Sequence, residues 1–484
     1  MNPLKNLIPE KLWHFFYEIT QVPRPSKKEE KIIAFLKEFA AQNTLSYQID
    51  AAGNMLFSKP AYPGYENKKA VILQGHTDMV AEKNESSAHN FETDPLCIRI
   101  DGDWVKAEGT TLGADNGIGA AAMMTILANK EIKHGPLTCL FTIDEESGMI
   151  GAGALSPDFL KGDILLNLDT EEDDELDIGC AGGVNTVITL SIPQQPARAD
   201  YQWFQISVSG LNGGHSGIEI HKGLGNALKI LVGFLHRFIE ASPLIGDIKG
   251  GGLSNAIPRE ASVVIGIPSV LADTVTTDCA IYEAHVQKEL AGVDTDVKIT
   301  CEKRAAPSNA YTTAFSKELI FALHHCPHGV LNMSREVPGL VDTSTNLASI
   351  KTVGSALVIT TSQRSFTDDG KEKASEMTVQ AFENMHPAIE KNEEYPGWKP
   401  NAHSEILKVA VAAYEKFHLE KPKILAVHAG LECGVFAQKN PKLDMISFGP
   451  TILSPHSPDE RVNIPSVLKF WNLLLEVLEN IPEK

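Results

Sequence analysis

The sequence predicts an α/β protein: a mainly parallel sheet flanked by helices, with a second, α+β domain inserted into it. Two observations carry this prediction. Short apolar runs alternate with helical patterns in 1–183 and again in 401–484. Most of these runs in 1–183 are followed by Asp, Glu or His, and the carboxyl ends of parallel strands meet at one edge of a sheet. We therefore expect one sheet, built from both ends of the chain, with polar side chains gathered along that edge.

The first segment, 1–183, opens with two helical patterns, at 9–20 and 27–42. Ser26 and Glu29 form a capping-box pattern at the second of these helices. Further along, a Gly-rich turn leads into an Ala- and Met-rich helix within 111–130, and Asp115 lies in that turn. Strands are predicted from short apolar runs at 54–57, 71–76, 136–144 and 163–169.

The inserted segment, 184–400, begins with a proline-containing stretch at 192–198 that we expect to be an exposed connector. The patterns that follow predict strands at 203–209, 261–267 and 356–361, and helices at 225–240, 312–325 and 371–385. The first pattern then resumes in 401–484, with a helix at 404–417, strands at 424–427 and 443–448, and a last amphipathic helix at 465–478. We therefore expect one domain formed by 1–183 and 401–484 and a second one formed by 184–400.

Composition excludes several classes of protein. The net charge is −19 and the chain has no long basic run, which argues against nucleic acid or an anionic membrane as the partner. The seven cysteines are scattered and never form a C-x-x-C pair, which is typical of reduced thiols in a cytoplasmic protein. Glu10, Lys11 and Glu18 interrupt the N-terminal apolar residues, so we expect no signal peptide, and no apolar run approaches the length of a membrane span.

Polar residues at the predicted strand ends form a mixed nitrogen and oxygen donor set. His-x-Asp, as in His76 and Asp78, is a weak signal by itself, although a carboxylate beside an imidazole can fix its tautomer for metal binding. Several such strand ends together suit Zn, Mn or Co; the set has too many carboxylates for a structural zinc site and too many imidazoles for calcium. An Asp that bridges two ions, with one His and one carboxylate for each, gives a two-metal site. The residues concerned are His76, Asp78, Asp115, Glu145, Glu146, Asp169 and His456.

Glu145 and Glu146 are adjacent, and one of them can bind metal while the other acts as general base on the attacking water. The spacing alone does not decide which residue has which task.

Five runs in this order carry a resemblance to a known family: GHTDMV, GADNG, DEESGMIGA, LLNLDTEE and SPHSPDERV. The chain resembles the co-catalytic zinc metallopeptidases, which include aminoacylase, carnosinase and peptidase T. Within that family it is most similar to the aminoacyl-histidine dipeptidases, also called peptidase D or cytosolic non-specific dipeptidases. The runs GLNGGHSGIEIHKGLGNA, SNAIPREA and HAGLECGVF support this, and the resemblance extends over essentially the whole chain.

The resemblance implies two divalent ions per chain, Zn²⁺ first, with Co²⁺ or Mn²⁺ as alternatives. One ion is bound by a His and an Asp, the other by a Glu and a His, and one Asp bridges them. The residues carried over are His76 and Asp169 for the first ion, Glu146 and His456 for the second, Asp115 as the bridge, Asp78 as the orienter of His76 and Glu145 as general base. In this family an Asp at position 169 is typical of enzymes whose substrates have a free amino group.

The resemblance also implies that the inserted domain is a lid that carries the contact of a homodimer. His215 is then the donor to the oxyanion, and Arg364 binds the substrate carboxylate. Asn255 and Gly430 are further substrate-binding candidates, whereas His428 and Glu432 fall in the same loop as Gly430 without an assigned role.

The function that follows is metal-dependent hydrolysis of dipeptides in the cytoplasm, Xaa-His dipeptides such as carnosine-like substrates included. Two alternatives on the same fold are a deacylase or amidohydrolase of N-acyl amino acids and a non-catalytic protein. A cysteine hydrolase built on Cys97 or Cys180 has no supporting His or Asn motif.

Overall fold

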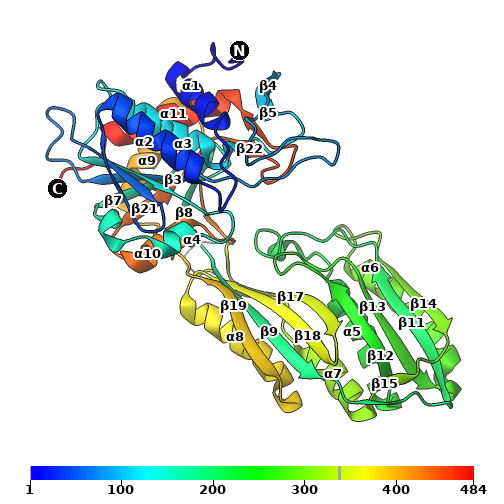
Figure 1. Ribbon diagram of the computed structural model, residues 1–484. Coiled ribbons are helices and arrows are strands. Elements are labelled where there is room, and N and C mark those ends of the chain that lie inside the picture. Colours follow the sequence, from blue (N-terminus) through cyan, green and yellow to red (C-terminus); the bar gives the residue numbers. More distant parts are fainter. Residues whose placement is uncertain (1, 336–338) are drawn as a thin grey trace. The chain divides into compact units, whose positions relative to one another are not determined.

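The structure is a computed structural model that describes residues 2–335 and 339–484 (Figure 1). The chain divides into two compact units. Unit 1 consists of Met1–Cys180, Trp398–Ala426 and Leu431–Lys484, and unit 2 consists of Ala181–Gly397 and Val427–Gly430. The main division lies within a few residues of the boundaries expected from the sequence. The short segment Val427–Gly430 differs, because it groups with the inserted unit although the sequence assigned it to the last segment.

Unit 1 is built on an eight-stranded sheet in the order β1-β2-β6-β3-β7-β21-β8-β20. Its centre, β6-β3-β7-β21, is parallel, while β1, β2 and β8 pair antiparallel. The predicted α/β class is therefore confirmed, with parallel pairing in the middle of the sheet. The strands are β1 (Ser46–Ile49), β2 (Met55–Lys59), β3 (Val71–His76), β6 (Leu137–Thr142), β7 (Ile164–Asn167), β8 (Glu175–Cys180), β20 (Lys423–Val427) and β21 (Asp444–Ser447).

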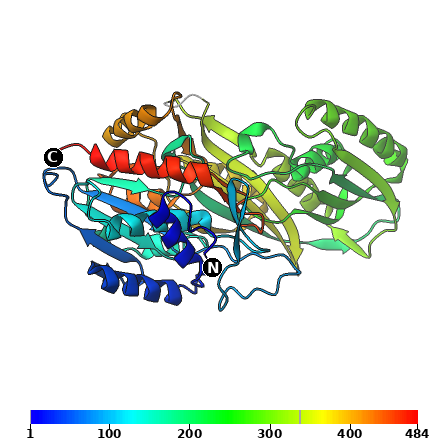
Figure 2. The same cartoon turned by 90° about the horizontal axis from the view of Figure 1, so that it is seen from above.

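Helices cover both faces of this sheet. One core joins the sheet to α1 (Glu10–Thr20), α2 (Glu30–Asn43), α3 (Ala114–Ala128), α9 (Glu405–Phe417) and α11 (Ile464–Glu479). Figure 2 shows α11 on this side of the sheet, and Figure 1 shows α4 (Ile150–Ala154) and α10 (Glu432–Lys439) on the other. Helix α3 is Ala- and Met-rich and is buried from Ala114 to Leu127, as expected of a helix with apolar residues on most sides.

A small four-stranded sheet completes unit 1. It has the order β22-β23-β5-β4 and joins the last part of the chain to the first. Its strands are β4 (Ile98–Asp101), β5 (Trp104–Ala107), β22 (Ile452–Leu453) and β23 (Arg461–Asn463).

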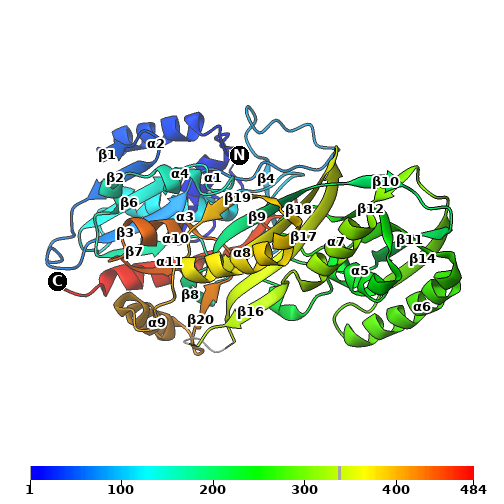
Figure 3. The same cartoon turned by 90° about the horizontal axis from the view of Figure 1, so that it is seen from below.

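Unit 2 is a nine-stranded sheet with helices packed on it. The order is β14-β11-β13-β12-β17-β18-β9-β19, with β16 also paired to β17, and the pairs are antiparallel. Figure 3 shows α5, α6, α7 and α8 along this sheet, and they share its apolar core. The elements are β9 (Gly182–Ser191), β11 (Tyr201–Ser209), α5 (Ala227–His236), β12 (Leu244–Gly251), β13 (Ala261–Pro268), α6 (Ala272–Glu289), β14 (Lys298–Arg304), α7 (Thr313–His325), β16 (Gly329–Met333), β17 (Val341–Val353), β18 (Ala356–Ser365), α8 (Asp368–Phe382) and β19 (Ala388–Tyr395). Among the described residues of either unit, no helix combines the length and the apolarity needed to cross a membrane.

One local prediction is wrong, and a second is incomplete. The capping box at Ser26 does not form: α2 begins at Glu30, Ser26 Oγ donates to Asp78 Oδ2 (2.8 Å), and the Glu29 carboxylate accepts from the backbone amides of Lys27 and Asp144. The stretch 192–198 is exposed or half-exposed, as expected, but it also forms a short strand, because β10 (Gln194–Pro196) pairs with β15 (Asn309–Tyr311). Tertiary hydrogen bonds outweigh the local signal in both places.

Candidate active site

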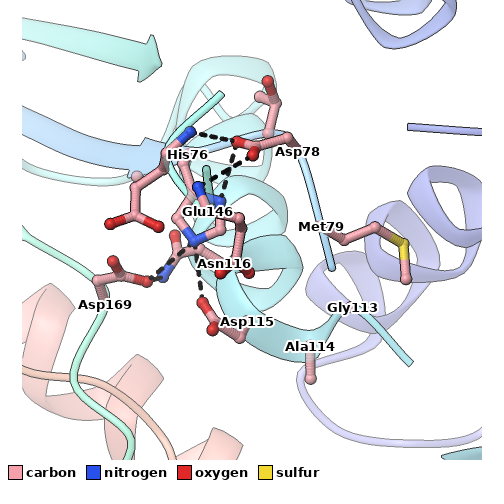
Figure 4. A network of polar contacts seen from close by, with 12 residues as sticks. His76, Asp78, Met79, Gly113, Ala114, Asp115, Asn116, Glu146 and Asp169 are labelled. Atoms are coloured by element: carbon pink, nitrogen blue, oxygen red, sulfur yellow. Dashed lines mark hydrogen bonds and ion pairs between the residues drawn. The ribbon is translucent and has the colours of Figure 1, made fainter. Parts of the chain in front are cut away.

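His76 ends strand β3 and is 1% exposed. Its Nδ1 lies 3.3 Å from Asp78 Oδ1, while Nε2 lies 2.9 Å from Asp115 Oδ1 and 3.6 Å from Asp169 Oδ1 (Figure 4). The carboxylate beside Nδ1 favours the neutral tautomer with its proton on Nδ1, and in that tautomer the lone pair of Nε2 faces the other two carboxylates. This is the arrangement required of a metal-binding imidazole.

Asp115 lies between two histidines. Its Oδ1 contacts His76, and its Oδ2 lies 3.2 Å from Nε2 of His456. The residue stands in the first turn of α3 with non-helical dihedrals (φ −78°, ψ 113°), directly after the turn at Gly113. One carboxylate therefore presents an oxygen to each imidazole, as a bridging ligand must.

His456 completes a second group with Glu146, whose Oε2 lies 2.9 Å from its Nε2. His456 has a φ of 58°, and Asp144, in the turn that carries Glu146, has a φ of 48°. Non-glycine residues in the left-handed region are uncommon, and they concentrate at functional sites.

The donor atoms form two groups that share one residue. Within each group the donor atoms lie within 4.8 Å of one another; one group is His76, Asp115 and Asp169, and the other is Asp115, Glu146 and His456. A further group joins Glu145 to His76 and Glu146. Mixed imidazole and carboxylate donors at this spacing fit two divalent cations of the Zn, Mn or Co type.

The ionisable groups of this centre shift one another's pKa values. Burial raises the pKa of Asp169 and of Glu145 well above the usual range, and neighbouring carboxylates add to the effect. Hydrogen bonds to Asp115 and Glu146 raise the pKa of His456 to about 11. Although burial opposes it, the two histidines hold the pKa of Asp115 below its usual value. Divalent cations relieve the repulsion between packed carboxylates, and so this centre suits them electrostatically.

Asp78 does more than face His76. Its two oxygens accept the backbone amides of Glu145 (3.1 Å) and Glu146 (3.2 Å) as well as the Ser26 hydroxyl. One buried carboxylate therefore orients the imidazole and the two consecutive glutamates together.

Two residues beside the centre had no role from the sequence. Asn116 donates its side-chain amide to Leu168 O (2.7 Å) and to the carboxylate of Asp169. Glu432, fully buried at the start of α10, accepts from Thr142 Oγ1 (2.8 Å) and from the Gln74 amide. Burial raises the pKa of Glu432 to about 7. Asn116 follows Asp115 directly, which is the one sequence signal that could have pointed to it.

Unit 2 contains the candidate oxyanion donor and the candidate substrate-binding residues. His215 Nδ1 accepts the backbone amides of Gly217 (3.2 Å) and Ile218 (3.0 Å), so its proton resides on Nε2. Burial and the Arg364 charge lower the pKa of His215 to about 4. The imidazole is therefore neutral near pH 7, with Nε2–H as a hydrogen-bond donor.

Arg364 lies inside strand β18, which continues to Ser365, past the strand end expected from the sequence. It is 7% exposed, and Nη1 donates to the Tyr395 hydroxyl (2.7 Å). The peptide oxygen of Asn255 accepts from Ser216 N (2.8 Å), so Asn255 supports the loop that carries His215 while its own side chain is exposed. Gly430 is half-buried near His428, whose Nε2 contacts Ser344 Oγ (2.8 Å).

The thiols of the cysteine alternative are not activated. Burial raises the pKa of Cys180 to about 12, and the Glu108 carboxylate raises the pKa of the exposed Cys97. The thiolate is the nucleophile in cysteine hydrolases, and both thiols stay protonated near neutral pH.

An α/β sheet with a shared-carboxylate donor cluster at its carboxyl edge indicates an enzyme that uses a pair of divalent cations. Residues 72–480 match the model of "Peptidase family M20/M25/M40". The chain is 40% identical over 485 residues to the cytosol non-specific dipeptidase of Escherichia coli (strain K12), with 100% of both chains covered. This chain therefore belongs to the M20/M25/M40 peptidase family, whose members are generally dinuclear metal enzymes. The family resemblance and the prediction of an enzyme are both confirmed.

Solved structures of other peptidases share the fold of this chain. The aminoacylhistidine dipeptidase from Vibrio alginolyticus is 44% identical and superposes with a TM-score of 0.93, covering 99% of this chain and 98% of its own. The aminopeptidase PepT from Bacillus cereus has a TM-score of 0.57 at 17% identity, covering 98% of this chain and 99% of its own, and shares the fold.

Proposed function

We propose that this protein is a metallo-dipeptidase that hydrolyses dipeptides, Xaa-His dipeptides included, with two divalent cations per chain. The observation that carries the proposal is the pair of three-residue donor groups sharing Asp115. The dipeptidases named in E. coli and Vibrio alginolyticus, each similar over nearly the full chain, support the substrate class.

His76 and Asp169 would hold one ion and Glu146 and His456 the other, with Asp115 between them. Zn²⁺ is the first choice, with Co²⁺ or Mn²⁺ as alternatives that the same donors accept. When bound, such a pair acts as a Lewis acid and lowers the pKa of water toward neutrality. The donors fit this task because the buried His76 offers Nε2 while Asp78 fixes its other nitrogen.

Glu145 is proposed as the general base. It takes a proton from the attacking water and passes it to the leaving amine. Two features support this assignment: its amide is held by Asp78, and its carboxyl group lies in the same group as His76 and Glu146. Glu146 is instead turned to His456, which suits a ligand.

His215 is proposed as the donor that stabilises the oxyanion of the tetrahedral intermediate, and its neutral Nε2–H form supports that role. Arg364 is proposed to bind the substrate carboxylate, with Asn255 and Gly430 as further contacts. Unit 2 would thus supply the groups that contact the oxyanion and the carboxylate of a short substrate.

A homodimer formed through unit 2 and a cytoplasmic location complete the proposal. The E. coli relative is named a cytosol enzyme, and all seven cysteines are free, which suits a reducing compartment. Sedimentation at several concentrations tests the dimer.

The proposed activity is tested with metal-reconstituted protein and a small substrate panel. Ala-His, β-Ala-His and Ala-Ala should be hydrolysed, whereas N-acetyl-Ala-His and Ala-Ala-Ala should be turned over far more slowly. Faster hydrolysis of the N-acetylated substrate would assign the chain to the deacylases instead.

A further inference from the structure

Two buried charged residues outside the proposed ligand set form hydrogen bonds to the backbone of the turn that leads to Asp115. Arg24 is 1% exposed and Glu460 is 2% exposed. Neither residue contacts a donor atom of the proposed ligands; both contact backbone groups of the segments that carry these ligands.

Arg24 connects the end of β3 to this turn. Its Nη1 donates to the carbonyl oxygens of Thr77 (2.9 Å) and Asp78 (2.7 Å), and its Nη2 donates to Gly113 O. The backbone adds to the link, because Met79 N donates to Arg24 O (3.2 Å). One guanidinium thus fixes the distance between the chain after His76 and the chain before Asp115.

Glu460 holds the same turn from its other side. Its Oε2 accepts the amides of Leu112 (2.7 Å) and Gly113 (2.9 Å), and its Oε1 accepts those of Ala114 (2.7 Å) and Asp115 (3.4 Å). Glu460 stands four residues after His456 in the chain. It therefore connects the turn to the segment that carries His456.

Two glycines leave the space that the Arg24 side chain occupies beside this turn. Gly113 has a φ of 65°, and a Cβ atom there would collide with the Arg24 guanidinium. A Cβ at Gly117 would meet the same guanidinium at 2.9 Å and the ring of Phe16 at 3.0 Å. Two glycines of the run TLGADNG thus make room for a buried arginine that the ligand chemistry does not use.

Burying two charges is costly unless they are compensated. Glu460 has four backbone amides, Arg24 has three carbonyl oxygens, and the two opposite charges attract each other. Because a hydrophobic pair could fill the same space at less cost, such an arrangement is best explained by the geometry that it imposes.

We propose that Arg24 and Glu460 are positioning residues that fix the turn bearing Asp115, so that its carboxylate stands between the ligand groups of His76 and His456. This inference rests on the proposed function, because it concerns the bridging ligand of the metal pair. Loss of either residue loosens the turn and weakens metal binding without removing a ligand.

The test compares zinc affinity with the stability of the metal-free protein. Glu460→Gln and Arg24→Lys are nearly isosteric substitutions. In Glu460→Gln, an NH₂ donor faces backbone amides that are themselves donors. In Arg24→Lys, a single ammonium group replaces the planar guanidinium, whose two terminal nitrogens donate to separate carbonyl oxygens. Zn²⁺ dissociation constants are measured by competition with a chromophoric chelator, and the melting temperature of each metal-free protein is recorded. Both variants should bind Zn²⁺ about 10–100-fold more weakly, the effect typical of residues that orient ligands. The double variant should be little worse than either single one, since both residues act on one turn.

Asp294→Asn is the matched control. Asp294 is fully buried in unit 2 and accepts the backbone amides of Asn212 (2.6 Å) and Gly225 (2.7 Å). Its replacement should lower the melting temperature of the metal-free protein but leave the Zn²⁺ affinity unchanged. If Glu460→Gln and Arg24→Lys behave in the same way, with Zn²⁺ affinity within twofold of wild type, their role is structural only and the inference is overturned. A wild-type chain that binds fewer than two Zn²⁺ ions would refute the proposed function instead.

Discussion

His215 offers a sharp test of how the inserted unit takes part in catalysis. Its Nδ1 accepts two backbone amides, at 3.2 and 3.0 Å, which leaves Nε2–H as the donor. With a pKa of about 4, about one molecule in a thousand carries the imidazolium at pH 7. The proposed oxyanion contact is therefore a neutral hydrogen bond from Nε2.

The substitution His215→Asn tests the roles of the two imidazole nitrogens separately. The Asn side-chain oxygen occupies the place of Nδ1 and can still accept the amides of Gly217 and Ile218, but nothing replaces Nε2–H. Removal of one oxyanion donor typically lowers kcat about 10²–10³-fold, or about 3–4 kcal/mol. Because this contact strengthens only in the transition state, KM should change little. His215→Gln, whose amide nitrogen reaches the place of Nε2, should retain more of the activity than His215→Asn.

The assay is steady-state hydrolysis of Ala-His, with bound metal measured on the same samples. His221→Asn, an exposed histidine near the same loop, is the control and should have wild-type kcat. A His215→Asn protein with kcat within threefold of wild type would refute the oxyanion assignment. Loss of metal in that variant would indicate that His215 is a ligand.

Three further predictions concern other residues. Glu145→Gln should keep both metal ions but lose about 10²–10⁴-fold in kcat, as expected for a missing general base; near wild-type turnover with full metal content would contradict the assignment. Asp78→Asn should weaken Zn²⁺ binding about 10–100-fold, because it disturbs His76 and the amides of both glutamates; unchanged affinity in a chelator competition would argue against the orienting role. Burial lowers the pKa of His428 from its ordinary 6.5 to about 3. Between pH 6.5 and pH 3 the unfolded chain therefore binds a proton at this residue that the folded chain does not bind, and the free energy of unfolding falls as the pH falls. His428→Gln should therefore avoid about 2 kcal/mol of the loss in unfolding free energy between pH 7 and pH 5, measured by urea denaturation, and an unaltered loss would show that another group is responsible.

The sequence predicts most of the proposed centre because its residues follow apolar runs. His76 and Asp169 stand at or just after the ends of buried strands, and Glu145 follows another by a short turn. Strand ends are set by local patterns, and a parallel arrangement brings them together. The family resemblance then separates the tasks of Glu145 and Glu146, which spacing leaves open.

Arg24 and Glu460 could not be predicted in this way. Glu460 bonds to the amide of Leu112, 348 residues away, and a backbone amide leaves no trace in the sequence. Arg24 lies in a proline-flanked link that reads as a turn, yet it is buried. Interactions between a side chain and a distant backbone group depend on the finished fold and not on any local pattern.

The inserted unit was predicted least completely. Helix α6 is long but carries polar residues on most of its surface, so its apolar periodicity is weak. Strand β17 contains Thr, Ser and Asn at buried positions, which hides it from a search for apolar alternation. Two of these side chains find partners in the neighbouring strand β18: Thr345 Oγ1 accepts from the Gln363 amide (3.1 Å), and Thr343 Oγ1 contacts Ser365 Oγ (3.0 Å).

The most direct test of the two-metal proposal is a titration of metal-free protein with Zn²⁺ in which Ala-His hydrolysis and bound metal are followed together. Two ions per chain should bind, and full activity should require that both sites are occupied. One site contains His76 and Asp169, the other contains Glu146 and His456, and Asp115 belongs to both. His456→Ala should then retain one ion and lose most of its turnover. Full activity at one ion per chain, or an unaltered metal count in His456→Ala, would contradict the account.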